Sequence, residues 1–356
     1  ARGVGRQLIG SPAGGVRGQS GGGDLTTDTA TDAFVPLLER VHSHGCKMFV
    51  QLHCGMTSPS GTPGAGYLGI DGIPEVLDKD GIRHVVEMVG LSTRNAARAG
   101  FDGIELHAAH LHSVGLFLSG FTNRRTDEYG GDLENRMRFA VECLEAIRAN
   151  IAPHMAVGIR MPCDEELPNG VTADEAREIA RRLEERGLVD FFDLDIGTSN
   201  TYWKLWAPHY LPTGWEVPYI AKVREAIRAV PVLGCSGRMQ DPEEAEAILA
   251  SGAMDMVGGT RGFFADAEFP RKAEEQRAAD IRPCIGMNAC LFDGQCVMNP
   301  VAYLEAEFGN TRLRPSPAPK RVVVVGGGPS GMEAARVASL RGHDVTLIAR
   351  SAELGG

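Results

Sequence analysis

Three histidines whose side chains could act together occur in the segment Leu106-His-Ala-Ala-His-Leu-His112. His107 and His110 are three residues apart, a spacing that places two side chains on the same side of a turn. Imidazole groups placed in this way can donate hydrogen bonds to a carbonyl oxygen and polarise it. His112 can donate a proton near neutral pH, since the reference pKa of histidine is about 6.5, or it can serve as a packing residue. A metal site formed by the three histidines is the weaker alternative, because no carboxylate accompanies them at a matching spacing.

Two segments in the second half of the chain join glycine to arginine, namely Gly237-Arg238 and Gly259-Thr260-Arg261. Glycine turns can bind phosphate through backbone N–H groups, and each arginine can add a bidentate contact. The two segments therefore indicate a site for the phosphate of a cofactor. The alternative is that the glycines serve only as turn residues.

Cys284, Cys290 and Cys296 fall within thirteen residues of one another. In a chain without a secretory signal, such a group indicates a metal site rather than disulfides. Thiolates hold iron–sulfur clusters because sulfur is soft and anionic. A structural zinc site and a loop that has lost its metal are the alternatives.

A dinucleotide-binding fingerprint lies near the C-terminal end. The apolar strand predicted at 321–325 runs into Gly326-x-Gly328-x-x-Gly331, followed by a helix and a second strand at 344–348. The glycines allow a tight turn and the close approach of a pyrophosphate to the helix N-terminus. Leu347-Ile-Ala-Arg350 stands where an acidic residue is expected, so either the ribose contact differs or an ADP moiety rather than a full FAD binds.

The composition is that of an ordinary globular protein. The chain has 356 residues, of which 43% are hydrophobic and 23% charged, and no apolar run reaches the ~18 residues of a membrane span. A net charge of −10 argues against a nucleic-acid partner. We expect a cytoplasmic protein that acts on a small molecule without binding a membrane. The sequence leaves open whether it forms a homo-oligomer.

Strand-like and helical segments alternate along most of the chain. The predicted strands are 4–9, 48–52, 103–106, 155–159, 191–196, 230–233 and 254–257, and the main predicted helices are 32–44, 85–99, 133–149, 173–186, 219–229 and 242–250. This alternation predicts βαβ units on a parallel sheet, either a barrel or a doubly wound sheet. Candidate functional residues follow the ends of different strands, as in a (β/α)8 TIM barrel. We therefore expect an α/β barrel, of which seven strands are recognised. Thr172 to Glu175 and Gly187 are expected to cap the helix at 173–186.

The longest motif is Phe101-Asp-Gly-Ile-Glu-Leu-His-Ala-Ala-His110, continued by Asn123-Arg-Arg-Thr-Asp-Glu-Tyr-Gly-Gly131 and Leu133-Glu-Asn-Arg136. It resembles the old yellow enzyme family of FMN-dependent oxidoreductases. The specific resemblance is to the long iron–sulfur branch that includes 2,4-dienoyl-CoA reductase and trimethylamine dehydrogenase. The resemblance covers almost the whole chain in order and implies that the first barrel strand is missing and that the chain is a fragment.

The resemblance implies roles for residues at the flavin. Gln51 and Arg160 are expected beside the N1/C2 oxygen edge of FMN, where Arg160 would stabilise the reduced ring. Replacement of Arg160 with alanine is then expected to lower the flavin potential and largely to spare the fold. His107 and His110 are expected to bind the carbonyl oxygen of the substrate.

Departures from the family pattern occur at two further sites. Thr260 replaces a usual glycine in the phosphate segment, and Met287 replaces a usual cysteine. The resemblance implies that Cys284, Cys290 and Cys296, with Met287 as a doubtful fourth ligand, hold a [4Fe–4S] cluster.

The implied organisation is an FMN-binding barrel at 1–275, an iron–sulfur connector and Pro-rich linker at 276–319, and the start of an FAD/NAD(P)-binding domain at 320–356. The implied function is hydride transfer from NAD(P)H, through FAD, the cluster and FMN, to an activated C=C bond of an enoyl thioester, enone or enoate. An amine dehydrogenase or N-demethylase is the alternative, since Tyr202, Trp203 and Trp206 could cage a cationic amine. The resemblance to trimethylamine dehydrogenase also implies an active-site aspartate, and no equivalent of it is recognised at 197–209. A flavin-free binding protein on a decayed barrel is a further alternative.

Overall fold

The computed structural model describes residues 4–10, 25–54, 57–60, 75–235, 238–292, 294–308 and 313–355. The chain divides into two compact units. The first consists of Ala1–Phe263 and Glu268–Asn288, and the second of Phe264–Ala267 and Ala289–Gly356. Gly237, a predicted phosphate-site residue, lies outside the described residues.

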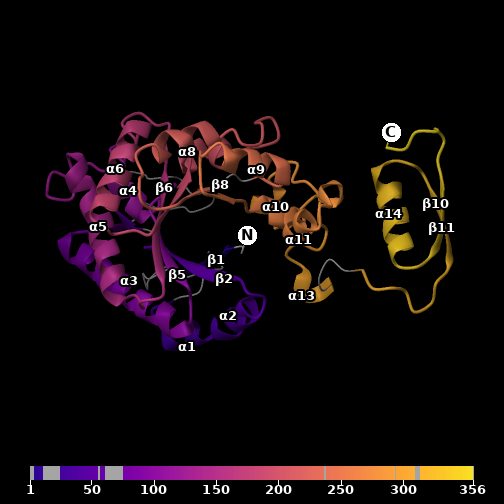
Figure 1. Ribbon diagram of the computed structural model, residues 1–356, viewed down its shortest axis with the longest axis horizontal. Helices are drawn as coiled ribbons and strands as arrows, with labels where there is room; N and C mark the ends of the chain where they lie inside the picture. The colour runs from indigo at the N-terminus through magenta and orange to yellow at the C-terminus, as the bar shows by residue number, and fades with distance from the viewer. Residues whose placement is uncertain are drawn as a thin grey trace. The chain divides into compact units, whose positions relative to one another are not determined.

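A seven-stranded sheet forms the centre of the first unit. Its strands are β1 (Val4–Gly10), β2 (Lys47–Leu52), β5 (Gly103–His107), β6 (Ala156–Pro162), β7 (Phe191–Asp195), β8 (Val232–Cys235) and β9 (Met256–Gly258). They pair in the order β1-β2-β5-β6-β7-β8-β9, and every pair is parallel. The neighbours follow chain order in one direction, whereas a doubly wound sheet reverses direction at a switch point. The α/β barrel prediction is therefore confirmed, and Figure 1 shows the sheet curling round.

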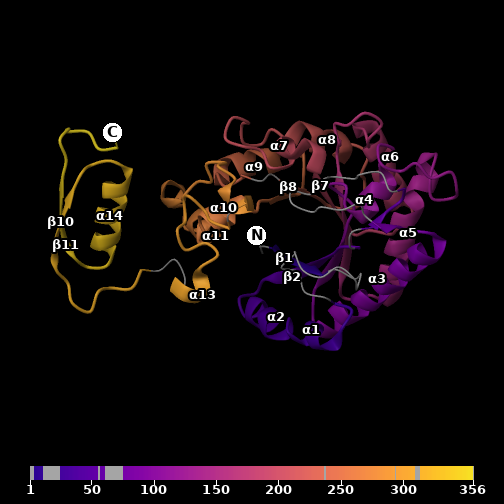
Figure 2. The ribbon, with the colours of Figure 1, turned by 180° about the vertical axis from the view of Figure 1, so that it is seen from behind.

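Helices cover the outer side of this curled sheet, as the opposite views of Figures 1 and 2 show. The α-helices described up to residue 274 are α1 (Asp28–Asp32), α2 (Val35–His42), α3 (Lys79–Ala99), α4 (Ser113–Leu118), α5 (Leu133–Asn150), α6 (Ala173–Glu185), α7 (Tyr202–Leu205), α8 (Val217–Arg224), α9 (Pro242–Ala250), α10 (Arg261–Ala265) and α11 (Phe269–Glu274). Two short strands, β3 (Thr57–Ser58) and β4 (Glu75–Val76), pair separately. No helix in the described part of the chain is both long enough and apolar enough to cross a lipid bilayer.

The predicted helix at 32–44 was wrong in its extent, because two helices, α1 and α2, occupy this region. Pro36 stands in the first turn of α2, where its missing N–H costs nothing, whereas within a longer helix it would break a hydrogen bond. The helix predicted at 85–99 begins earlier, because the side chain of Asp78 accepts a hydrogen bond from Gly81 N and so caps α3.

The ends of α6 agree with the predicted caps. Thr172 Oγ1 accepts a hydrogen bond from Glu175 N at 3.3 Å, and Gly187 follows the helix with a φ of +64°, as a helix-terminating glycine does. The second hydrogen bond of a capping box would run from Thr172 N to the Glu175 carboxylate. In its place, this carboxylate forms an ion pair with Arg136.

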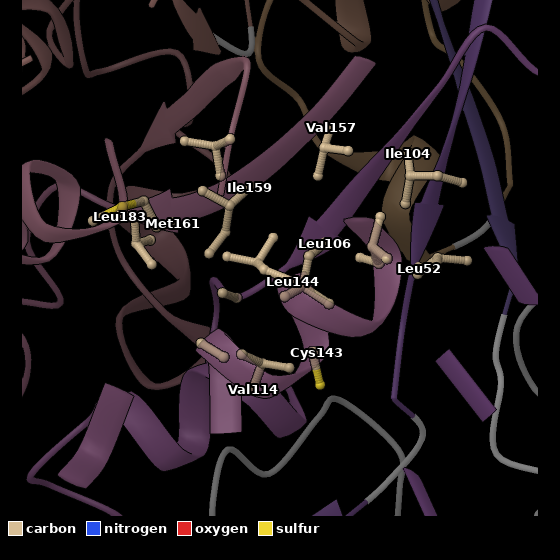
Figure 3. Packing of buried hydrophobic residues seen from close by; sticks show 14 of the residues in the cluster. Leu52, Ile104, Leu106, Val114, Cys143, Leu144, Val157, Ile159, Met161 and Leu183 are labelled. Carbon is tan, nitrogen blue, oxygen red and sulfur yellow. The ribbon is translucent and has the colours of Figure 1, made fainter. Parts of the chain in front are cut away.

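Alternation along the strands separates an apolar face from a polar one. Figure 3 shows Ile104 and Leu106 of β5 packed among other apolar side chains, and both are fully buried. Because successive residues of a strand point to opposite faces, Glu105 and His107 lie on the other face. The neighbouring strands place further polar residues on that face, namely Gln51, Arg160, Asp193 and Asp195. The register pairs Gln51 with Glu105, His107 with Arg160, and Arg160 with Asp193.

The second unit contains the predicted strand–helix–strand segment. Its elements are the short helices α12 (Ala289–Phe292) and α13 (Glu305–Phe308), strand β10 (Arg321–Val325), helix α14 (Pro329–Leu340) and strand β11 (Asp344–Ile348). Strands β10 and β11 are parallel neighbours. Gly326 has a φ of +115°, and a Cβ on Gly331 would lie 1.9 Å from the carbonyl oxygen of Gly326. Both positions therefore require glycine.

Candidate functional site

A group of polar side chains lies at the carboxyl ends of β2, β5, β6 and β7. Gln51 Nε2 donates a hydrogen bond to Glu105 Oε1 at 2.6 Å. Glu105 is buried. His107 is the next residue on the same face of β5, and the register of the sheet pairs His107 with Arg160 of β6. The structure therefore brings together three of the predicted residues, Gln51, His107 and Arg160, at the end of a barrel where enzymes of this architecture carry their sites.

Arg160 forms ion pairs with two buried carboxylates of β7. Its Nε lies 2.7 Å from Asp195 Oδ2 and 3.3 Å from Asp193 Oδ2, and its second terminal nitrogen lies 2.6 Å from Asp195 Oδ2. The side chain of Asp193 is fully buried. Burial alone would raise the pKa of Asp195, but the positive charges of His110 and Arg160 lower it below its usual value. Arg160 thus compensates charges that would otherwise be very costly to bury.

His110 is held in an unusual backbone conformation. His110 and Leu111 have φ values of +60° and +58°, which non-glycine residues seldom adopt. A parallel bridge to Thr198 and a hydrogen bond from Ser199 Oγ to the His110 carbonyl, at 3.0 Å, hold this turn. As a result, His110 Nε2 lies 2.6 Å from Asp195 Oδ2. Such strain is common where a side chain must be held in place for function.

A histidine cluster, consisting of His53, His107 and His112, lies beside this pair. The ring centroids are 4.1 Å apart for His53 and His112, 4.6 Å for His107 and His112, and 5.2 Å for His53 and His107. The ring of His110 is 5.2 Å from that of His107. Burial, followed by the charge of His110, lowers the pKa of His53 to about 4. Burial and the neighbouring positive groups hold the pKa values of His107 and His112 well below the usual range.

The predicted phosphate arginines contact one loop. Arg238 donates to the Leu211 carbonyl. Arg261 is buried and donates to the carbonyl oxygen of Ala207 at 2.9 Å and to Asn288 Oδ1. Asn288 Nδ2 in turn donates to the Trp206 carbonyl at 2.7 Å. The structure thus brings both guanidinium groups to the segment at 206–211, and Gly259 and Thr260 precede Arg261 in the turn after β9.

The donor set fits an FMN. The amide of Gln51 on β2 and the guanidinium of Arg160 on β6 flank β5 on the polar face, and Arg238 and Arg261 follow the last two strands. These are the groups that the pyrimidine edge and the phosphate of a flavin require. His107 Nδ1 is buried without a hydrogen-bond partner among the described residues, which leaves a polar atom available at the face where a ligand would bind.

The sequence analysis missed the buried acidic residues. The segment 197–209, in which no aspartate was recognised, begins two residues past Asp195, and Asp195 is the carboxylate in contact with His110. Two acids alternating in the apolar segment Phe191-Phe-Asp-Leu-Asp195 were the available sign, because a buried strand seldom carries unpaired charges. Glu165 was also missed. It accepts hydrogen bonds from Ser119 Oγ at 2.5 Å and Val171 N at 2.8 Å, and burial raises its pKa to about 7.

The aromatic residues after β7 are not enclosed. The rings of Tyr202 and Trp203 pack edge to face with centroids 5.6 Å apart, and the two residues are 46% and 44% exposed. A cation–π cage for an amine works best when it excludes water. Their exposure therefore gives no support to a cage in this loop.

The predicted iron–sulfur ligands are divided between the units. Cys284 and Met287 belong to the first unit, and Cys290 and Cys296 to the second. None of the three cysteines forms a disulfide in the described part of the chain, all three are of intermediate exposure, and Met287 is 64% exposed. The iron–sulfur cluster therefore stays a prediction from the sequence.

Comparisons with known families match the two parts of the chain separately. Residues 9–280 match the NADH:flavin oxidoreductase / NADH oxidase family, and residues 300–355 match the pyridine nucleotide-disulphide oxidoreductases. The first match contains the polar face and the histidine cluster. The second contains the glycine fingerprint.

Individual relatives have different activities. NADH oxidase of Thermoanaerobacter brockii is 37% identical over 352 residues, which are 93% of this chain and 53% of that protein. N,N-dimethylglycine/sarcosine dehydrogenase of Chromohalobacter salexigens is 36% identical (94% and 51%), and cinnamate reductase of Clostridium sporogenes is 34% identical (90% and 52%). The structure of histamine dehydrogenase from Rhizobium sp. 4-9 superimposes with a TM-score of 0.87 at 29% identity and covers 99% of this chain and 54% of that one. The chain therefore spans about half the length of the curated relatives that it matches.

Proposed function

Because the chain belongs to the NADH:flavin oxidoreductase / NADH oxidase family, we propose that it carries the FMN site of an enzyme that reduces an activated C=C bond with electrons from NAD(P)H. The family membership makes it a flavin-dependent oxidoreductase rather than a flavin-free binding protein. The observation that carries the choice of substrate is the imidazole pair of His107 and His110, whose ring centroids are 5.2 Å apart. An enoyl thioester, enone or enoate presents the carbonyl or carboxylate oxygen that such a pair binds.

The side chains of the polar face have separate roles in this proposal. His107 and His110 hold the substrate oxygen by hydrogen bonds that strengthen as negative charge develops on it. Asp195 positions His110 through the 2.6 Å contact with Nε2. Arg160 and Gln51 hold the pyrimidine edge of the FMN, while Arg238, Gly259, Thr260 and Arg261 hold its phosphate. Bound FMN would supply the hydride.

The role of His112 is that of a neutral neighbour. Its pKa lies well below the usual range because of burial and the charges around it, so its protonated form is scarce at neutral pH. Of the two roles predicted from the sequence, packing is favoured over proton donation.

The route of the electrons is part of the proposal. Residues 320–355, with Gly326, Gly328 and Gly331, would bind FAD, and the pyridine nucleotide family match supports this assignment. Cys284, Cys290 and Cys296, with Met287 at the weakest position, would hold a [4Fe–4S] cluster in the connector at 276–319. The barrel would then extend over 1–275. We propose NAD(P)H as the electron source.

Oxidation of an amine is a second candidate, favoured by a specific contact. The buried carboxylate of Asp195 beside His110 provides the aspartate that the sequence analysis did not recognise, and one of the relatives is a dimethylglycine/sarcosine dehydrogenase. The exposed Tyr202 and Trp203 do not add to this candidate.

Turnover of matched substrates tests the proposal. The purified protein is assayed with an enone or cinnamate and NADH or NADPH, and separately with an N-methylated amine and an artificial electron acceptor. We expect NAD(P)H-dependent loss of the alkene and no reduction of the acceptor by the amine. The opposite pattern would replace the proposal with the second candidate.

Binding of a phenol tests the histidine pair directly. A phenolate oxygen resembles the negative oxygen of the reduced substrate and gives a long-wavelength charge-transfer band with oxidised FMN. Replacement of His107 or His110 with alanine should cost ~1.5–3 kcal/mol, the value of a charge-assisted hydrogen bond, and so weaken phenol binding roughly tenfold or more. His154→Ala, at an exposed position, is the control. Unaltered titrations in both site variants would contradict the role.

A further inference from the structure

The histidine cluster offers ligands of the kind that transition metals bind. His53, His107 and His112 each have a ring nitrogen, and the three ligand atoms lie within 4.8 Å of one another. We propose that this cluster binds a divalent transition-metal ion, best matched by Zn²⁺, through three imidazole nitrogens. His107 also belongs to the imidazole pair of the proposed function, so the metal would take one ring nitrogen of His107 and leave the other for the substrate oxygen.

The distances are close to those that three zinc ligands need. With a Zn–N distance of about 2.0–2.1 Å, tetrahedral ligand nitrogens lie about 3.3 Å apart. If His107, which is buried on β5, keeps its position, closing from at most 4.8 Å requires the other two ring nitrogens to move by about 1.5 Å. His53 and His112 are only partly buried, and rotation of their side chains is the movement that the proposal requires.

A buried nitrogen of the cluster lacks a partner. His107 Nδ1 has no hydrogen-bond partner among the described residues, although it is inaccessible to solvent. A buried polar atom without a partner costs free energy. A metal ion that takes Nδ1 as its ligand would remove that cost.

Charged side chains lie close to the cluster without belonging to it. Glu105, Asp193 and Asp195 are buried carboxylates on β5 and β7, and Arg160 is the guanidinium that pairs with two of them. His110 is not part of the cluster, since its Nε2 faces Asp195.

The structure explains why the sequence pointed elsewhere. His107, His110 and His112 form the obvious trio along the chain, but the strained turn at His110 directs that ring to β7. His53 takes its place, because β2 is the neighbour of β5 in the sheet and the registers align Leu52 with Leu106. Three histidine ligands leave a fourth coordination position open for water or for an oxygen of a ligand, as in catalytic zinc sites.

Metal binding by wild type and matched variants tests the proposal. Zn²⁺ binding is measured by equilibrium dialysis and metal analysis for the wild type, His53→Gln, His112→Gln and the exposed control His154→Gln. The cysteines at 284–296 are the same in all four proteins, so differences isolate the histidines. We expect the wild type and the control to bind one Zn²⁺ ion in addition to any ion that the cysteines hold. Both cluster variants should bind this ion about a hundredfold more weakly, a larger effect than the loss of an outer-shell partner. Equal binding by all four would overturn the proposal.

A spectroscopic measurement keeps the test decisive if a variant does not fold. Cu²⁺ is added to the wild type, and the nitrogen couplings of the copper signal are recorded by pulsed electron paramagnetic resonance. Couplings from several imidazoles support the site. A signal with thiolate or oxygen ligands alone overturns it.

Discussion

Replacing Arg160 with alanine should lower the free energy of unfolding by about 3–5 kcal/mol, the cost of breaking a buried ion pair by removing one partner. The guanidinium lies 2.6–2.7 Å from Asp195 Oδ2 and 3.3 Å from Asp193 Oδ2, and both aspartates are buried. Without it, two carboxylates remain in the interior, with the imidazole of His110 2.6 Å from Asp195 as the remaining contact. The sequence analysis expected the fold to be largely spared, and the structure changes this expectation.

Urea unfolding at neutral pH, followed by circular dichroism, measures the effect. A variant that combines Arg160→Ala with Asp193→Asn and Asp195→Asn removes both buried charges and should recover much of the lost stability. Arg160→Lys keeps the charge but not the two-pronged contact and should fall between the wild type and the alanine variant. A loss below about 1 kcal/mol in Arg160→Ala, the range typical of exposed ion pairs, would contradict the structural role.

The stability of the protein should also depend on pH through Glu165. Burial raises the pKa of this carboxyl from 4.5 to about 7, so the folded state holds a proton that the unfolded state releases at a lower pH. Between these two values the folded state binds more protons, and the free energy of unfolding therefore falls as pH rises. The fall in the free energy of unfolding is about 3 kcal/mol when the difference in pKa is converted at 1.36 kcal/mol per pKa unit. This fall is complete once the pH exceeds about 7.

Glu165→Gln removes this ionisation while keeping an oxygen that can accept hydrogen bonds from Ser119 and Val171. We expect the variant to gain stability relative to the wild type as pH is raised from about 4.5 to about 8, where the wild type carries the buried charge. The measurement is the free energy of unfolding in urea at several pH values. Glu246→Gln changes an exposed carboxyl and is the control. Parallel pH profiles of wild type and Glu165→Gln would show that this carboxyl does not carry the dependence.

The architecture and the main motifs could be predicted from the order of the residues. Alternating apolar and amphipathic segments predicted the strands of the parallel sheet, because burial on both faces gives each parallel strand a recognisable apolar run. The glycines at 326–331 predicted a strand–turn–helix, since a φ of +115° at Gly326 and the contact at Gly331 can be met only by glycine. The histidine motif of β5 likewise predicted the end of the barrel at which polar residues gather.

Which of these residues come into contact could not be predicted from local sequence, because it depends on the pairing of distant strands. Arg160 reaches Asp195 and His110 reaches the same carboxylate because β6 and β7 are parallel neighbours in a particular register. His53 joins His107 across 54 positions of the sequence because β2 lies beside β5. Periodicity is a local property and reports which face a side chain occupies. Register and the curl of the sheet depend on contacts between distant segments, and these contacts decide whether an isolated histidine or aspartate becomes part of a site.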